Sequence, residues 1–292
     1  MDANAPIVFP IRTMLKHITL LTAFFAAFTL SAARVDTVTI ATTHIVSPAK
    51  AVVITPDSKT QGRLFPSVYI LHGYGGAYSD WTNLIRQNLP ELADRYGMVM
   101  IMPDGRDSWY WDAEKNPGMQ MESFFVKDLV PYIDANYPTI KTPDQRAITG
   151  LSMGGHGALW LAIRHSNIWG NAGSMSGGLD IRPFSKKWKM DQALGPIENN
   201  AESWDKHTVI NLVDSLIPGQ LNVTIDCGVD DFFIDVNRNV HKKLVYAKIP
   251  HDYSERPGKH NRQYWKNSIL YHLLFFNEAF NKASNDNTTS GK

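Results

Sequence analysis

Short apolar runs that end in turn residues recur along the chain. They lie at residues 67–72, 97–103, 146–150, 171–177 and 222–228. Runs that are apolar at nearly every position are typical of strands in a parallel sheet that is covered on both faces. Two earlier segments, 36–46 and 49–55, are predicted to open the sheet as an antiparallel pair.

Helical patterns separate these runs. Residues 121–138 form one pattern, and Pro131 is expected to kink it because proline lacks the backbone N–H. Two further apolar stripes are expected to face the sheet: Phe232, Val236, Val240 and Leu244 in one helix, and Trp265, Ile269, Leu273, Phe276 and Phe280 in another. Strands that alternate with helices predict an α/β protein, with a mainly parallel central sheet and helices on both faces.

The first 33 residues follow a different pattern. After Lys16, an apolar run covers residues 18–30, and the small residues Ser31, Ala32 and Ala33 follow it. This order predicts a secretory signal peptide, with residues 1–13 as an upstream extension. The run is short for a membrane span, although an uncleaved anchor is the alternative. We expect a secreted or periplasmic protein with no stable span after cleavage. Residues 34–283 would form one domain and 284–292 a polar tail.

The composition narrows the classes of partner. A formal net charge of +1 over 292 residues gives no reason to expect a nucleic acid partner. Cys227 is the single cysteine, so an intramolecular disulfide and a cysteine metal cluster are both excluded.

The segment from Gly150 to Gly154 matches the pattern G-x-S-x-G and lies between a predicted strand and a predicted helix. In α/β-hydrolases this pattern forms a sharp turn that exposes the serine hydroxyl. Glycines are needed there because side chains would clash with neighbouring backbone. The N–H of Met153, at the helix start, would point toward a developing oxyanion. We predict that Ser152 is a nucleophile. The alternative is a serine that only caps the helix.

A nucleophilic serine needs a histidine base and a carboxylate that orients it. In α/β-hydrolases the order along the chain is serine, acid, histidine. His260 lies in a loop before the last predicted helix, where it can reach Ser152. Asp226 lies within the strand 222–228, whereas Asp230 and Asp231 follow it. The pattern leaves open which of these two faces His260.

A second oxyanion donor is expected from the loop after the strand 67–72. This loop reads Gly73-Tyr74-Gly75-Gly76, and glycines let the backbone approach a substrate oxygen closely. A phosphate-binding loop is the alternative. The segment contains neither G-K-[ST] nor G-x-G-x-x-G, which argues against nucleotide binding.

Six segments together resemble the esterase D group of α/β-hydrolases. That group includes feruloyl esterases, acetyl and tributyrin-type carboxylesterases, S-formylglutathione hydrolases and mycolyltransferases. The matching segments extend over about residues 68–271 and are YILHGYGGAYSDW, MPDGRDSWYWD, KDLVPYIDANYP, RAITGLSMGGHGALWLA, DCGVDDFF and PGKHNRQYW. The resemblance implies the α/β-hydrolase fold for nearly the whole mature chain.

The resemblance also implies roles for particular residues. These are Ser152 as nucleophile, His260 as base, Asp231 as orienting acid, and the N–H groups of Tyr74 and Met153 as the oxyanion hole. Chemistry of this kind needs no metal or organic cofactor. Lys259 is a departure, because relatives commonly have a glycine before this histidine.

The expected function is a secreted serine esterase that hydrolyses feruloyl or acetyl esters of plant polysaccharide. A general short-chain carboxylesterase and an S-formylglutathione hydrolase-like thioesterase are alternatives. The signal peptide argues against the latter, because that pathway is cytosolic. Hydrolysis and acyl transfer are not distinguished. A catalytically silent binding module of the same fold is the alternative outside enzymes.

Three adjacent aromatic residues, Trp109, Tyr110 and Trp111, follow the strand 97–103. Loops at this end of a parallel sheet surround the active site. We expect at least one of the three to be exposed and to bind an aromatic acyl group or a sugar ring. The alternative is that they pack the loop onto the body of the domain.

Overall fold

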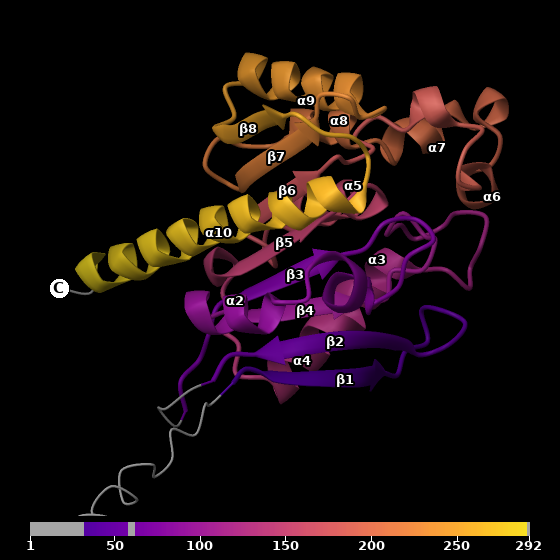
Figure 1. Cartoon of the computed structure of the whole chain (residues 1–292). Coiled ribbons are helices and arrows are strands. Elements are labelled where there is room, and N and C mark those ends of the chain that lie inside the picture. The colour runs from indigo at the N-terminus through magenta and orange to yellow at the C-terminus, as the bar shows by residue number, and fades with distance from the viewer. Residues whose placement is uncertain (1–31, 58–61, 291–292) are drawn as a thin grey trace, which may run out of the picture. The chain divides into compact units, whose positions relative to one another are not determined.

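The structure, a computed structural model, describes residues 32–57 and 62–290, with side chains as far as residue 286. The segment 18–30 that predicts a signal peptide lies outside the described residues. The described chain contains an eight-stranded sheet with the order β1-β2-β4-β3-β5-β6-β7-β8 (Figure 1). The strands are β1 (Arg34–Ile40), β2 (Ala49–Thr55), β3 (Ser67–Leu71), β4 (Val99–Pro103), β5 (Arg146–Gly150), β6 (Asn171–Met175), β7 (Asn222–Gly228) and β8 (His251–Arg256).

The sheet is mainly parallel, as predicted. β1 pairs antiparallel with β2, and β2 pairs antiparallel with β4, which confirms the antiparallel opening pair. The strands from β4 to β8 all pair parallel. Carboxyl ends of parallel strands meet at one edge of a sheet. The loops that follow β3, β5, β7 and β8 therefore converge, and the predicted catalytic and oxyanion-hole residues lie in these loops or directly after them.

Helices lie between the strands. They are α2 (Leu89–Tyr96), α3 (Met121–Phe124), α4 (Val130–Asn136), α5 (Met153–Arg164), α6 (Met190–Leu194), α7 (Ala201–Lys206), α8 (Val209–Leu212), α9 (Ile234–Tyr246) and α10 (Arg262–Ser290). The predicted helix 121–138 is confirmed as α3 and α4, joined by a π-helical segment, Phe125–Leu129. This change in hydrogen bonding comes directly before Pro131, which lacks the N–H that a regular α-helix would use there.

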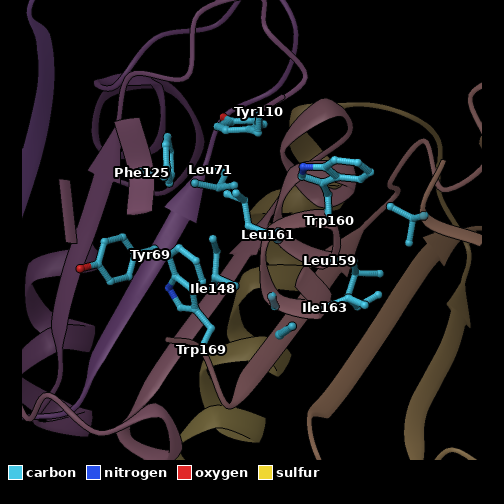
Figure 2. Close-up of a cluster of buried hydrophobic side chains, with 14 of the residues drawn as sticks. Tyr69, Leu71, Tyr110, Phe125, Ile148, Leu159, Trp160, Leu161, Ile163 and Trp169 are labelled. Atoms are coloured by element: carbon cyan, nitrogen blue, oxygen red, sulfur yellow. The ribbon is translucent and has the colours of Figure 1, made fainter. Parts of the chain in front are cut away.

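Apolar side chains cover both faces of the sheet. Alternate residues of β3 enter two separate cores: Tyr69 and Leu71 enter one, and Val68 and Ile70 the other. The first core also takes side chains from α3, α4, α5 and α9, whereas α2 and α10 complete the second. Figure 2 shows part of the first core, where side chains of α5 pack against β3 and β5. The near-continuous apolar strands are thus explained by burial on both sides.

The predicted stripe on the last helix is confirmed, because all five of its apolar residues are buried in α10. In α9, Val236, Val240 and Leu244 are buried as predicted. Phe232 was wrongly assigned to this face. It precedes the helix, which begins at Ile234, and it is 53% exposed. At the C-terminus, residues 284–292 were expected to form a polar tail. The structure instead continues α10 as far as Ser290.

No helix in the described part of the chain is both long and apolar enough to cross a membrane.

Candidate active site

Ser152 lies in a strained turn between β5 and α5. Its backbone angles are φ 55° and ψ −117°, a region that non-glycine residues rarely adopt and that costs about 1–3 kcal/mol. The flanking glycines make the turn possible. A Cβ on Gly154 would lie 2.6 Å from the carbonyl oxygen of His72, and a Cβ on Gly150 would lie 2.6 Å from the backbone of Gly154. Close packing of α5 against the ends of β3 and β5 therefore requires glycine on each side of Ser152.

His260 reaches Ser152 from the loop between β8 and α10. Its Nε2 lies 2.9 Å from Ser152 Oγ. Gly258, at φ 153°, forms the turn that leads into this residue. A Cβ on Gly228 would lie 2.5 Å from the Gly258 carbonyl oxygen, so the loop after β8 packs directly against the end of β7. The ring of Phe232 covers the imidazole at a centroid distance of 4.2 Å.

Asp231 holds the other side of the imidazole. His260 Nδ1 lies 2.8 Å from Oδ2 and 3.0 Å from Oδ1 of Asp231. The Asp231 side chain is fully buried, and its Oδ1 also accepts the N–H of Phe233 at 2.8 Å. A carboxylate beside Nδ1 favours the tautomer in which Nδ1–H donates to it. The Nε2 lone pair then faces the Ser152 hydroxyl, as a general base requires.

Asp230 and Asp231, between which the sequence pattern does not decide, are adjacent in the chain but differ in environment. Asp231 contacts His260, whereas Asp230 is exposed and uses its backbone N–H to bind the Gly258 carbonyl at 2.9 Å. The third candidate, Asp226, is buried elsewhere, where it accepts a hydrogen bond from Ser268 and pairs with Arg256. Only Asp231 among the three has the geometry expected of an orienting acid.

Two backbone N–H groups are positioned beside Ser152. Met153 is the first residue of α5, where the helix presents its positive end. Tyr74 follows Gly73, whose Cβ, if present, would lie 3.4 Å from the Ser152 Cβ. Within the described residues, the N–H groups of Tyr74 and Met153 make no hydrogen bond. The loop is held by Asp107, which accepts the Gly75 N–H at 2.6 Å. Both donors are therefore available to a substrate oxygen.

A cavity of about 270 Å³ opens at Ser152 and His260. Trp188 and Phe232 form part of its wall, with ring centroids 6.0 Å apart and ring planes inclined by 25°. Sequence reasoning missed both residues. Trp188 lies between lysines, with no periodic apolar pattern around it, and Phe232 was read as part of a helix face. The DCGVDDFF segment alone could have placed Phe232 near the site, since it directly follows Asp231.

The three aromatic residues after β4 are buried, so the expectation of an exposed platform is wrong. Trp109 is 2% exposed, and Tyr110 and Trp111 are 0% exposed. Tyr110 Oη donates to the His72 carbonyl at 2.9 Å. A Cβ on Gly157 would lie 2.2 Å from the Tyr110 ring, so the missing side chain makes room for that ring. The loop therefore supports the end of β3 and the start of α5 rather than lining the cavity.

A buried histidine on α5 also holds this aromatic loop in place. His156, on α5, accepts a hydrogen bond from Trp111 Nε1 at 2.9 Å, and its Nδ1–H donates to the Gly178 carbonyl at 2.9 Å. Burial lowers the pKa of His156 to about 3. The imidazole is neutral at ordinary pH, and its two nitrogens each have one partner.

Within residues 32–57 and 62–286, no group of three or more histidine, cysteine, aspartate or glutamate side chains could hold a metal ion.

Comparisons with known proteins identify the family of this chain. A family model described as "Putative esterase" matches residues 43–276. Esterase Rv1288 of Mycobacterium tuberculosis (strain ATCC 25618 / H37Rv) is 29% identical over 244 residues, which cover 73% of this chain and 52% of that protein. The acetyl esterase of Caldicellulosiruptor saccharolyticus is 27% identical over 234 residues, which cover 73% of this chain and 85% of that protein.

Solved structures share the fold. A ferulic acid esterase superposes with a TM-score of 0.71 at 24% sequence identity, and the match covers 85% of this chain and 99% of that chain. This likeness concerns the fold alone. The chain spans about half the length of the esterase from M. tuberculosis.

Proposed function

This chain belongs to the Esterase family, and from that premise we propose that it is a secreted serine carboxylesterase that works through an acyl-enzyme on Ser152. The observation that carries the proposal is the hydrogen-bonded line from Asp231 through His260 to Ser152, with distances of 2.8 and 2.9 Å. The three side chains contact one another in the order acid, base and nucleophile, and both contacts are within hydrogen-bond distance, as this chemistry requires.

The first half of the reaction forms the acyl-enzyme. His260 Nε2 takes the proton from Ser152 Oγ while that oxygen bonds to the ester carbonyl carbon. The carbonyl oxygen becomes an oxyanion and accepts the N–H groups of Tyr74 and Met153. Each such donor lowers the barrier by about 3 kcal/mol in known cases. The imidazolium then gives its proton to the leaving alcohol as the ester C–O bond breaks.

The second half releases the acid. Water loses a proton to His260 Nε2 and attacks the acyl carbon, and a second oxyanion occupies the same two donors. The bond to Ser152 Oγ breaks, and the imidazolium returns the proton to the serine. Asp231 keeps the imidazole in the required tautomer and stabilises its positive charge in both halves. No step needs a metal or an organic cofactor.

The substrate class we propose is a feruloyl or acetyl ester of plant polysaccharide. The aromatic walls formed by Trp188 and Phe232 next to His260 support a flat acyl group, because aromatic rings favour offset or edge contacts with other rings. A relative that is an acetyl esterase supports the acetyl option. Export is supported by the apolar run at residues 18–30. A general short-chain carboxylesterase is the alternative.

The test is hydrolysis of four substrates by the purified protein: p-nitrophenyl acetate, methyl ferulate, acetylated xylan and S-formylglutathione. We expect the highest kcat/KM on methyl ferulate or acetylated xylan. Ser152→Ala is the control and should lose at least about a thousandfold in kcat while staying folded. A preference for S-formylglutathione would support the thioesterase instead. No hydrolysis of any substrate by folded protein would leave a silent binding module.

A further inference from the structure

A second cavity, of about 600 Å³, lies behind the loop that carries His260. Residues 259–263, at the end of the loop and the start of α10, alternate between the two cavities. His260 and Arg262 line the cavity at Ser152, whereas Lys259, Asn261 and Gln263 line the second one. The two cavities have no lining residue in common. The second cavity is therefore a separate site, one loop away from the proposed chemistry.

One face of α10 forms a wall of this second cavity. Gln263, Asn267 and Tyr271 follow one another at intervals of four residues, which places them on the same side of the helix. All three are exposed. Within the described part of the chain, the side-chain amides of Gln263 and Asn267 make no hydrogen bond. Two amides, each with donors and an acceptor, are thus available next to an aromatic ring.

The ring of Tyr271 stacks against a charged side chain. The Arg256 guanidinium lies against one face of this ring, 4.2 Å from the ring centroid. Arg256 is itself fixed by Ser254, at 2.8 Å, and by an ion pair with the buried Asp226. Although Arg256 covers part of it, Tyr271 is 55% exposed. An aromatic surface that is fixed in advance loses little conformational entropy when a ligand stacks on it.

The charges of the second cavity nearly cancel. Asp226 balances Arg256, and the lining residues Lys259 and Asp230 carry opposite charges. An anionic ligand would find little net positive charge. A purely apolar ligand would leave the amides of Gln263 and Asn267 without partners, which is costly when water is displaced. A neutral ligand with hydroxyl groups around an apolar ring face fits both the amides and the tyrosine.

We propose that the second cavity is a binding site for a neutral oligosaccharide chain, stacked on Tyr271 and hydrogen-bonded by Gln263 and Asn267. Pyranose rings have a C–H face that packs on an aromatic ring and an edge of hydroxyls that pair with amides. Lys259, which also lines this cavity, adds a hydrogen-bond donor. The proposal goes beyond the esterase function and does not depend on which ester is hydrolysed.

The test is isothermal titration calorimetry of the whole protein with xylohexaose, cellohexaose and maltohexaose. We expect at least one of them to bind with a Kd of about 1 mM or lower. Tyr271→Ala should weaken that binding at least about tenfold, because it removes the stacking surface. Tyr271→Trp should retain it. The matched control is Tyr246→Ala, which removes a tyrosine that is 90% exposed at the end of α9, away from the cavity.

Several outcomes would overturn the proposal. One is that none of the three oligosaccharides binds. Another is that Tyr271→Ala, folded with an unchanged melting temperature, binds as tightly as the wild type. A third is that the sugar binds but competes with p-nitrophenyl acetate at the concentration of its Kd, which would place it at Ser152. Because the calorimetric titration itself contains no ester, failure to bind sugar and failure of the esterase proposal are separate results.

Discussion

At the scale of single residues, the role of a side chain in the site depends on its exact position along the backbone. Asp230 and Asp231 are neighbours of the same chemical type, yet one is exposed and the other is fully buried against His260. The Asp231 carboxylate, next to Nδ1, does not line the cavity at Ser152. Its contribution is to hold one tautomer and to offset the charge that the imidazole gains during the reaction.

This difference predicts unequal effects for a matched pair of variants. Asp231→Asn should lower kcat on p-nitrophenyl acetate by about 10⁴, because an amide favours the wrong tautomer of His260. Asp230→Asn should cause a far smaller loss. Steady-state kinetics of both variants, with melting temperatures to verify folding, make the comparison. The reverse order of losses would contradict the arrangement.

A second prediction at this scale concerns the aromatic wall. Trp188→Ala should raise KM for methyl ferulate by about tenfold, because the ring that faces a flat acyl group is lost. The KM for p-nitrophenyl acetate should change much less, since an acetyl group is too small to use the whole wall. KM values for the two esters measure the effect. Equal increases for both esters would mean that Trp188 shapes the cavity generally and does not select aromatic acyl groups.

At the scale of secondary structure elements, α5 connects the nucleophile to a buried polar network. Ser152 directly precedes the helix, and Met153 begins it. His156, the fourth residue of α5, bridges Trp111 and the Gly178 carbonyl. A buried imidazole with a lowered pKa stays neutral in the folded protein, whereas the same group takes up a proton in the unfolded chain near its ordinary pKa.

This difference predicts how stability changes with pH. The pKa of His156 is about 3 in the folded protein and about 6.5 in an unfolded chain. Between these values the unfolded chain binds more protons, so stability falls as the pH decreases from about 6.5 toward 3. His272, with a pKa also lowered to about 3, adds to the same trend.

The measurement is the melting temperature at about pH 7 and about pH 5. His156→Asn should be less stable than the wild type at pH 7, because its partners lose a fitted imidazole. The decrease between the two pH values should nevertheless be smaller, since one titrating group is gone. Identical decreases in variant and wild type would show that His156 does not contribute.

At the scale of the whole molecule, the first described strand begins directly after the predicted signal. β1 starts at Arg34 and pairs with β2 from its first residue, Arg34 opposite Thr55. Removal of everything before Arg34 would therefore leave the outermost strand of the sheet intact. An edge strand that keeps all its pairs is compatible with processing at this point.

The prediction is a mature protein that begins near Arg34 and is found outside the cytoplasm. The basis is the apolar run at 18–30, followed by the small residues Ser31, Ala32 and Ala33. N-terminal sequencing of the exported protein measures the cleavage site. Retention of residues 14–33 on protein recovered from membranes would instead indicate an uncleaved anchor.

Local patterns were enough to predict every strand except β8, the main helices and the loop positions of Ser152 and His260. Continuous apolar runs indicate a sheet that is buried on both faces, because every residue in such a strand packs into one of the two cores. The G-x-S-x-G pattern indicates a sharp turn, because backbone atoms lie too close to the positions beside Ser152 for any residue but glycine. These features depend on neighbours in the chain, so they can be recognised without a three-dimensional structure.

Other features arise only when distant segments meet. Burial of Trp109, Tyr110 and Trp111 depends on α5 and the end of β3, which provide the space and the hydrogen-bond partners. The aromatic wall at the cavity brings Trp188 against Phe232, 44 positions further along the chain. The second cavity likewise forms where the loop after β8 folds over α10. Such contacts follow from packing across the whole domain, and no local pattern of apolar and polar residues encodes them.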